Sequence, residues 1–244
     1  MITVENVSVW GFEHAIRGMR NPMNSWDKSD SHFHYNDCIY CVHEHEDCGK
    51  NHRVMYGGVC FNIGENDLDL MRRLYKAGNE HRKFLRQIFV CMDITAPLYW
   101  WKEFDTYKVG TVANSCSTMH KIHAKKFTLD DFSCEHLIND ILDETCVIVG
   151  EIDELYAPKD VLEFIIRSLN VNRDTYLKTN DKKYWWQMIQ LLPSSYNQKR
   201  TITMNYENVV NIINQRQYHK LDEWIMFVQD LKALPYIREI RGEE

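Results

Sequence analysis

Apolar residues recur along this chain with two spacings, which separate the expected helices from the expected strands. A repeat of three or four residues places apolar side chains on one face of a helix, and a repeat of two places them on one face of a strand. Helices are expected at residues 12–19, 66–77, 98–107, 132–142, 158–177, 184–192, 206–216 and 222–234, and strands at residues 2–9, 87–95 and 201–204. This succession predicts an α+β fold.

The stretch from residue 95 to residue 121 combines a helix start with a polar loop. Ala96-Pro97 follows an apolar strand, and proline suits the first turn of a helix because its missing N–H is not needed there. The residues after this helix are rich in Gly, Thr, Ser and Asn and include Lys108 and Cys116. Backbone N–H groups, hydroxyls and a cation together suit a phosphate. The sequence therefore predicts a phosphate-holding loop.

Composition and charge narrow the classes of partner. The chain has 244 residues and is 44% apolar, with no internal repeat or linker, so we expect a single domain over residues 1–244 with an irregular Cys/His-rich insertion at about 30–62. It has no apolar run of 18 residues and no signal-like start, so we expect a cytoplasmic protein that does not enter a membrane. The net charge of −6 disfavours a nucleic-acid polymer but allows a nucleotide monomer.

The insertion contains a possible metal site. Its candidate ligands follow the spacing Cys-x2-Cys-x6-Cys-x3-His and are Cys38, Cys41, Cys48 and His52. Four such ligands suit a tetrahedral structural zinc in a reducing compartment. The spacing matches no standard zinc finger, so a Cys/His-rich surface loop without metal is the alternative.

The pattern near the C-terminus resembles that of a known family. Its characteristic positions, in order, are Leu192-Pro193, a threonine-containing strand at 201–203, Asn205, Asn211 and Arg216. This order and spacing resemble the flavin-dependent thymidylate synthases, the ThyX family. The resemblance covers roughly residues 9–30 and 64–235. It implies a ThyX-like fold with a mostly antiparallel sheet flanked by long helices.

The stretch at residues 95–121 is similar to the family's signature region, in which Arg-His-Arg is followed by Ser, Asn, Ser and Arg. Aligned without gaps from Ala96-Pro97, the motif positions hold Thr106, Tyr107, Lys108, Thr111, Ala113, Cys116 and Thr118. The glutamine just upstream becomes Glu103, and a slip by one residue brings Asn114 and Ser117 onto the motif Asn and second Ser. The family histidine ahead of the strand falls near Gln87, with His81 close by.

The resemblance implies a role for each of these positions. In the family, reduced flavin mediates transfer of a methylene group from tetrahydrofolate to dUMP, followed by a hydride. The residues expected at the flavin are Asn205, Asn211, Asn114 and Thr111. Those expected at the nucleotide are Arg216, Glu103, Ser117 and Thr118, and those with catalytic roles are Cys116, Lys108 and Tyr107. The implied ligands are FAD, a pyrimidine nucleotide, folate and NADPH, and the implied assembly is a homotetramer.

Two departures from the family pattern leave alternatives open. Neither alignment restores the motif arginines, and threonine does not replace a bidentate contact between arginine and phosphate. This favours a non-catalytic protein that binds or sequesters a nucleotide, or an enzyme that acts on a different nucleotide. Cys116 in place of serine favours an enzyme, since a thiolate is a nucleophile toward a pyrimidine ring. The other interpretation of Cys116 is a small buried residue.

Overall fold

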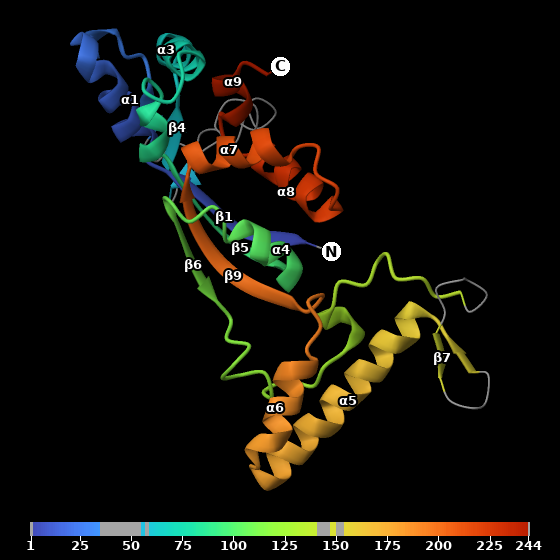
Figure 1. Cartoon of the computed structure of the whole chain (residues 1–244). Coiled ribbons are helices and arrows are strands. Elements are labelled where there is room, and N and C mark those ends of the chain that lie inside the picture. The colour runs from blue at the N-terminus through green and yellow to red at the C-terminus, as the bar shows by residue number, and fades with distance from the viewer. Residues whose placement is uncertain (1, 35–54, 57–58, 141–146, 150–153, 244) are drawn as a thin grey trace, which may run out of the picture. The chain divides into compact units, whose positions relative to one another are not determined.

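The structure is a computed structural model that describes residues 2–34, 55–56, 59–140, 147–149 and 154–243 (Figure 1). The chain divides into two compact units. Unit 1 comprises Met1–Thr3, Ile94–Thr106 and Asn114–Arg200, and unit 2 comprises Val4–Asp93, Tyr107–Ala113 and Thr201–Glu244. The insertion expected at about 30–62 lies largely outside the described residues.

The chain contains both helices and strands, in runs that do not alternate regularly. The helices are α1 (Phe12–Arg20), α3 (Glu65–Lys76), α4 (Leu98–Phe104), α5 (Pro158–Thr179), α6 (Lys182–Leu191), α7 (Tyr206–Arg216), α8 (Asp222–Lys232) and α9 (Ile237–Arg241). Short 3-10 helices are η1 (Asn21–Met23), η2 (Trp26–Lys28), η5 (Lys83–Gln87) and η6 (Leu129–Asp131). The strands are β1 (Thr3–Trp10), β2 (His32–His34), β3 (Met55–Tyr56), β4 (Val59–Asn62), β5 (Phe89–Pro97), β6 (Thr111–Ser115), β7 (Val147–Val149), β8 (Glu154–Tyr156) and β9 (Asn197–Asn205).

The strands form three sheets. The largest has the order β1-β5-β9-β6. A second has the order β2-β4-β3, and β7 pairs with β8; the pairs in these two smaller sheets are antiparallel. Among the described residues, no helix has both the length and the apolar character needed to cross a bilayer.

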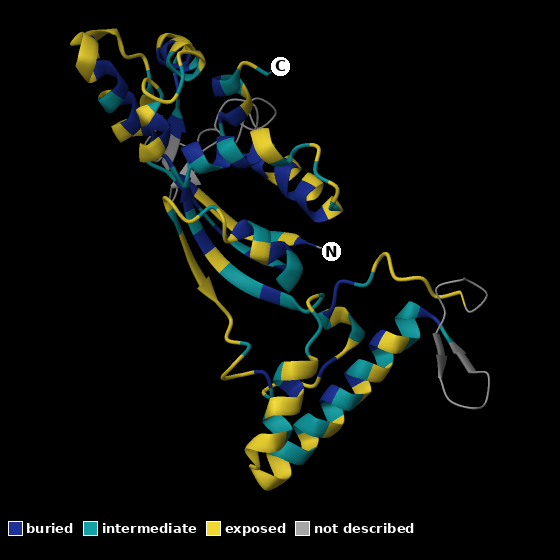
Figure 2. Cartoon of the chain, in the orientation of Figure 1, coloured by how far each residue is buried: buried dark blue, intermediate teal, exposed yellow. Residues whose placement is uncertain are grey.

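Unit 2 has an aromatic core around the first helix. The Phe12 ring stacks on Phe61 and makes edge contacts with Tyr206 and Tyr236, at centroid distances of 5.6–6.1 Å. Helix α1 packs on η5, and η5 also packs on α7. Helices α7 and α8 each have a buried face, which is dark blue in Figure 2. This packing fixes η5 between the first helix and α7.

A buried carboxylate ties the loop before β2 to α3. The side chain of Asp67 is fully buried and forms an ion pair with Arg20, which is also buried. It accepts hydrogen bonds from the Ser29 and Ser31 hydroxyls, both at 2.7 Å, and from the backbone N–H groups of Asp30 and Ser31 at 3.1 Å. In return, the Asp30 carboxylate accepts from the N–H groups of Asn66 and Asp67 at the start of α3. The loop and the helix thus cap each other.

In unit 1 the α5 and α6 helices form a hairpin. Asn180 ends α5 in the left-handed conformation (φ 51°), a region that asparagine tolerates better than most residues. A cluster of apolar side chains fills the interior of the hairpin and the segment against it: Ile122, Phe127, Phe132, Leu162, Ile166, Leu169 and Met188. The Asn170 side chain holds this segment through two hydrogen bonds with the Phe127 backbone, at 2.8 and 2.9 Å.

Most of the expected elements are present, and two expectations are wrong. Residues 132–140 contain no helix, because the capping box of Thr128 and Asp131 starts only the single turn η6 and Phe132 then continues as extended chain, bridged to Tyr196. The polar segment expected as a loop forms strand β6 over Thr111–Ser115. Its backbone joins the large sheet next to β9.

Candidate functional site

The start of α7 is the centre of the candidate site in unit 2. Strand β9 leads directly into α7, and Asn205 caps the helix by accepting a hydrogen bond from the Asn208 N–H at 3.0 Å. The following residue, Tyr206, is fully buried and donates its N–H to the Ile88 carbonyl at 2.9 Å. The first turn of α7 is therefore fixed by its own cap and by the residue between η5 and β5.

The segment after Tyr107 docks on this first turn. The Asn208 amide donates to the Val109 carbonyl at 2.7 Å and to the Thr111 hydroxyl at 2.9 Å. Gly110 has φ +76°, and a Cβ atom there would lie 2.6 Å from the Asn205 amide nitrogen. Glycine is therefore required both for the backbone conformation and for the close approach. Asn205 and Thr111, two residues predicted at the flavin, thus lie together.

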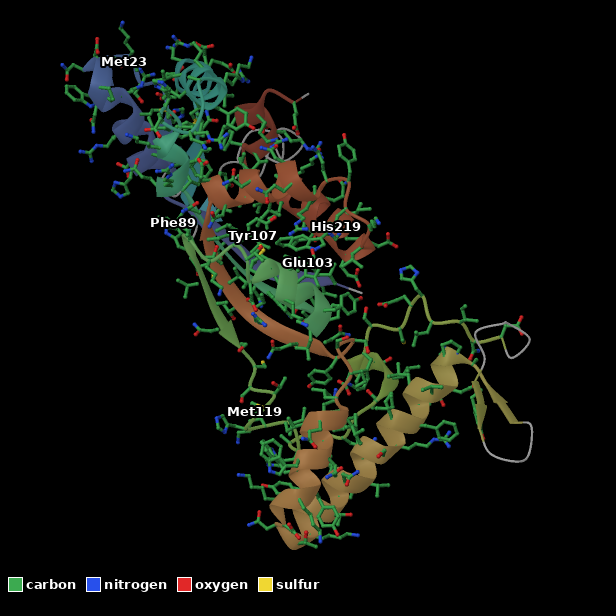
Figure 3. The ribbon with its side chains drawn as sticks, viewed as in Figure 1. Met23, Phe89, Glu103, Tyr107, Met119 and His219 are labelled. Atoms are coloured by element: carbon green, nitrogen blue, oxygen red, sulfur yellow. The ribbon has the colours of Figure 1, made fainter. Side chains whose placement is uncertain are left out.

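Tyr107 and Arg216 form the second part of the site. The Arg216 Nε donates to the Tyr107 hydroxyl at 3.0 Å, and this hydroxyl donates to the Gln215 Oε1 at 2.9 Å. The Arg216 guanidinium also lies over the buried Trp224 ring, 4.8 Å from its centroid. Figure 3 labels Tyr107 beside α7 and His219 beyond the end of that helix. Tyr107, at the position of the motif histidine, therefore contacts the arginine predicted to bind the nucleotide.

Asn211 belongs to a third group, which includes a buried ion pair. The Arg82 guanidinium donates to Glu207 Oε1 at 2.8 and 3.1 Å and to the Asn211 Oδ1 at 3.4 Å. The side chains of Arg82 and Glu207 are only 12% and 10% exposed. Glu207 Oε2 has no hydrogen-bond partner among the described residues. Asn211 thus presents its remaining amide N–H groups next to a paired charge.

The other predicted residues belong to unit 1, with the exception of Lys108. The Thr106 hydroxyl donates to the Glu103 carbonyl at 2.7 Å at the end of α4, and Asn114 is exposed in β6. Ser117 accepts a hydrogen bond from the His120 N–H at 2.9 Å, and Thr118 is half-buried. Lys108, in unit 2, is exposed. The predicted site residues are thus divided between the two units.

Cys116 is exposed, so its interpretation as a small buried residue is wrong. Its backbone is fixed on both sides: the N–H donates to the Lys199 carbonyl at 2.9 Å, and the carbonyl accepts from the Gln198 amide at 2.8 Å. Burial, together with the nearby Asp131 carboxylate, raises the pKa of the Tyr196 phenol in the same unit. The Cys116 thiol is thus exposed, and two hydrogen bonds fix the backbone that carries it.

A cavity of about 590 Å³ in unit 2 adds residues that the sequence motifs did not identify. It lies between α1, η1 and η5, and Met23, labelled in Figure 3, is at its edge. His81 and Lys83 line it together with Gln87. In the sequence comparison, the family histidine falls near Gln87, with His81 close by. This alignment is the one sequence signal from which the cavity could have been predicted. Glu80 and Asn21 add two more polar side chains, and the remaining walls include the apolar side chains of Met19, Leu74 and Phe84.

The zinc prediction for Cys38, Cys41, Cys48 and His52 lies outside the described residues. Within the described ranges, no group of His, Cys, Asp or Glu has an arrangement that could hold a metal ion.

Comparison with known proteins identifies the fold. The sequence matches no known protein-family model and no curated protein. The structure is similar to flavin-dependent thymidylate synthase ThyX from Helicobacter pylori complexed with FAD and dUMP, with a TM-score of 0.58, 17% identity and 97% of each chain covered. A second structure of that protein with FAD and dUMP gives the same TM-score and identity over 98% of this chain and 95% of the other. The UMP/dUMP methylase PolB from Streptomyces cacaoi, bound with 5-Br dUMP, has a TM-score of 0.53 and 14% identity over 99% of this chain and 95% of its own. The chain therefore has the ThyX fold, as its motifs predicted.

Proposed function

We propose that the protein is an enzyme that methylates a pyrimidine nucleotide with the help of a flavin. The observation that carries the proposal is the near-full-length match to ThyX and to the UMP/dUMP methylase, which were crystallised with FAD and dUMP or with 5-Br dUMP. These proteins have in common a bound pyrimidine nucleotide, dUMP or its 5-bromo derivative. The substrate class proposed here is therefore dUMP or UMP.

Arg216 is the residue we assign to the nucleotide. A guanidinium presents several N–H donors in a planar fork and suits a phosphate or a ring carbonyl. Its Nε is already committed to Tyr107, and its plane lies over Trp224, so the fork is held in one orientation before substrate binds. Such preorganisation reduces the entropy cost of binding. Tyr107 accordingly acts as a positioning residue for Arg216.

The residues around the cavity of about 590 Å³ fit part of FAD. Lys83 offers a cationic donor for its phosphates and His81 a ring N–H, Asn21 and Gln87 offer amides, and the apolar walls suit a ring, while Glu80 suits a sugar hydroxyl rather than a phosphate. Asn205 and Asn211, at the start and middle of α7, would supply further amide contacts. Bound FAD would supply the hydride that turns a transferred methylene group into a methyl group, with NADPH as reductant and methylenetetrahydrofolate as one-carbon donor.

The second candidate function is nucleotide binding without catalysis, and it is favoured by Thr106. This residue stands where the family motif has an arginine, and its hydroxyl is engaged with the Glu103 carbonyl. One preorganised donor to developing charge is commonly worth about 3–4 kcal/mol in the transition state. Without replacement, the loss of several such donors would leave binding intact while reducing turnover by orders of magnitude. In a homotetramer, as the family resemblance implies, a neighbouring chain would be the source of replacement cations.

One experiment separates the two functions. Purified protein is examined for flavin absorbance and then incubated with dUMP or UMP, methylenetetrahydrofolate and NADPH, and the nucleotide is analysed by mass spectrometry. The enzyme proposal expects stoichiometric flavin and a methylated nucleotide. A nucleotide-dependent rise in Tm without flavin or product would instead support the binding protein, and the absence of flavin, product and any rise in Tm would refute both.

Variants connect the result to the site. Arg216→Gln removes the charged fork, and Arg216→Lys keeps the charge but not the geometry; both are expected to weaken nucleotide binding, the glutamine variant more strongly. Arg86→Gln is the matched control, since Arg86 is exposed in η5 and does not line the cavity of about 590 Å³. Cys116→Ser tests the proposed nucleophile: turnover should be abolished if the thiol attacks the pyrimidine ring, and equal turnover would remove that role.

A further inference from the structure

A second cavity, of about 510 Å³, opens on the outer face of α1 in unit 2. Its walls are His14, Arg17, Gly18, Asn21, Trp26 and Gln87. It shares Gly18, Asn21 and Gln87 with the cavity assigned to part of FAD. No residue of α7 or of the segment from Tyr107 to Thr111 lines it, so it is distinct from the nucleotide site at Arg216. Its volume falls within the range of about 300–1,000 Å³ that is usual for small-molecule sites.

The inner wall of this cavity is fixed by glycine. A Cβ atom at Gly18 would lie 2.5 Å from the Gln87 Oε1, and one at Gly11, where φ is +98°, would lie 2.1 Å from the Gln87 carbonyl oxygen. The absence of these side chains lets α1 approach the end of η5 closely. The Gln87 amide is consequently held against the helix, where it faces the cavity.

The polar side of the cavity is formed by Arg17, which is positively charged, and by His14. His14 and Arg17 are three residues apart on α1, so their side chains are neighbours on one face, and both are exposed. Neither side chain forms a hydrogen bond or an ion pair within the described part of the chain. By contrast, Arg20 and Arg82 in the same unit are paired with carboxylates. No carboxylate is among the residues that line this cavity, although the chain as a whole carries a net charge of −6.

The opposite side is an aromatic wall. Trp26 is 53% exposed, and its Nε1 donates to the Asn21 Oδ1 at 2.8 Å. This hydrogen bond satisfies the polar group of the indole and fixes the orientation of the ring. What remains available is an aromatic face, which stacks favourably on a planar ring whatever the identity of the base.

We propose that this cavity binds a nucleoside monophosphate, with the base stacked on Trp26 and the phosphate held by Arg17 and His14. Charge-assisted hydrogen bonds from arginine to phosphate are the strongest contacts that the lining offers. The Gln87 and Asn21 side chains form the wall that this cavity shares with the one assigned to part of FAD, so the contacts specific to this site come from Arg17, His14 and Trp26. The proposal is independent of catalysis and predicts a second nucleotide on each chain.

The test is to titrate the full chain separately with UMP, with uridine and with inorganic phosphate. Binding of each is measured by Trp fluorescence and by calorimetry. UMP should bind more tightly than either fragment, because only UMP contacts both walls. Arg17→Gln should weaken this binding by at least about tenfold through loss of one charge-assisted contact. Trp26→Ala should weaken it similarly, whereas Trp26→Phe should retain binding and lose the fluorescence change.

Two controls separate this site from the one at Arg216. Arg216→Gln should leave binding at this cavity unchanged, so that loss of the proposed function does not mimic failure of the inference. Arg86→Gln changes the net charge by the same amount as Arg17→Gln at an exposed position outside both cavities. The proposal is overturned if UMP does not bind, if Arg17→Gln and Trp26→Ala bind UMP like the wild type, or if phosphate alone binds as tightly as UMP.

Discussion

Replacing Asp67 with alanine should strongly destabilise unit 2. The substitution leaves the Arg20 guanidinium buried without its carboxylate and removes the acceptor from the Ser29 and Ser31 hydroxyls. Removing one partner of a buried ion pair commonly costs about 3–5 kcal/mol. For a protein of this size each kcal/mol lowers the Tm by roughly 2–4 °C. We therefore expect a Tm lower by roughly 6–20 °C, measured by calorimetry and checked by urea unfolding.

The control for this experiment lies on the same helix. Asp69 pairs with Arg73, one turn away, but both side chains are more than half exposed, at 61% and 67%. Exposed pairs of this kind contribute about 0.3–0.5 kcal/mol. Asp69→Ala should therefore change the free energy of unfolding by less than about 1 kcal/mol. If Asp67→Ala were no more harmful than Asp69→Ala, the account of the buried network would be wrong.

The remaining predictions concern pH, the site and unit 1. Burial opposes ionisation of Asp67, but hydrogen bonds from Ser31 and Ser29 and the Arg20 charge outweigh it and lower the pKa of that carboxyl. The stability that the Asp67 carboxylate contributes should be fully present above its unfolded-state pKa of about 3.9. It should be lost as the pH falls through the lower pKa of Asp67 in the folded protein. A destabilisation by Asp67→Ala that stays constant down to pH 2 would contradict this. Gly110→Ala should cost roughly 1–3 kcal/mol through the left-handed backbone and the contact with Asn205, seen in thermal unfolding; an unchanged Tm would contradict it. Tyr107→Phe should weaken nucleotide binding about tenfold with little change in Tm, and equal affinity in calorimetry would refute its positioning role. Asn170→Ala should lower stability by about 1–3 kcal/mol because two Phe127 backbone groups lose their partners, and a denaturant midpoint like that of the wild type would count against this.

The regular helices could be predicted because their signals are local. Helix α7 begins and ends where its apolar spacing and the Asn205 cap place it. The expected helix at 132–142 failed because its apolar residues serve a tertiary contact instead: Phe132 packs in the cluster of the α5–α6 hairpin. The segment at Thr111–Ser115 has polar residues typical of a loop, but it lies next to β9, and pairing with that strand decides its conformation. The spacing of apolar residues within one segment carries no information on such contacts with distant segments, so these two elements could not be predicted from it.

The candidate site was predictable only in part for a related reason. Motif spacing identified Tyr107 and Arg216, which the structure brings into contact, but it could not show that their side chains bond to each other. The cavity near His81 was missed because its walls come from α1, η1 and η5, with no common motif. Trp26 carries no family signal at all, and its role depends on a hydrogen bond to Asn21.

The two asparagines at the start of α7 also affect how the site opens. Asn205 caps the helix, and Asn208 holds the Val109 carbonyl and the Thr111 hydroxyl. The segment from Val109 to Thr111 cannot separate from α7 without breaking both hydrogen bonds of the Asn208 amide. Local opening events involve contiguous cooperative units. In native-state hydrogen exchange, the amides around Gly110 and those of the first turn of α7 should therefore exchange as one group, with nucleotide slowing both together.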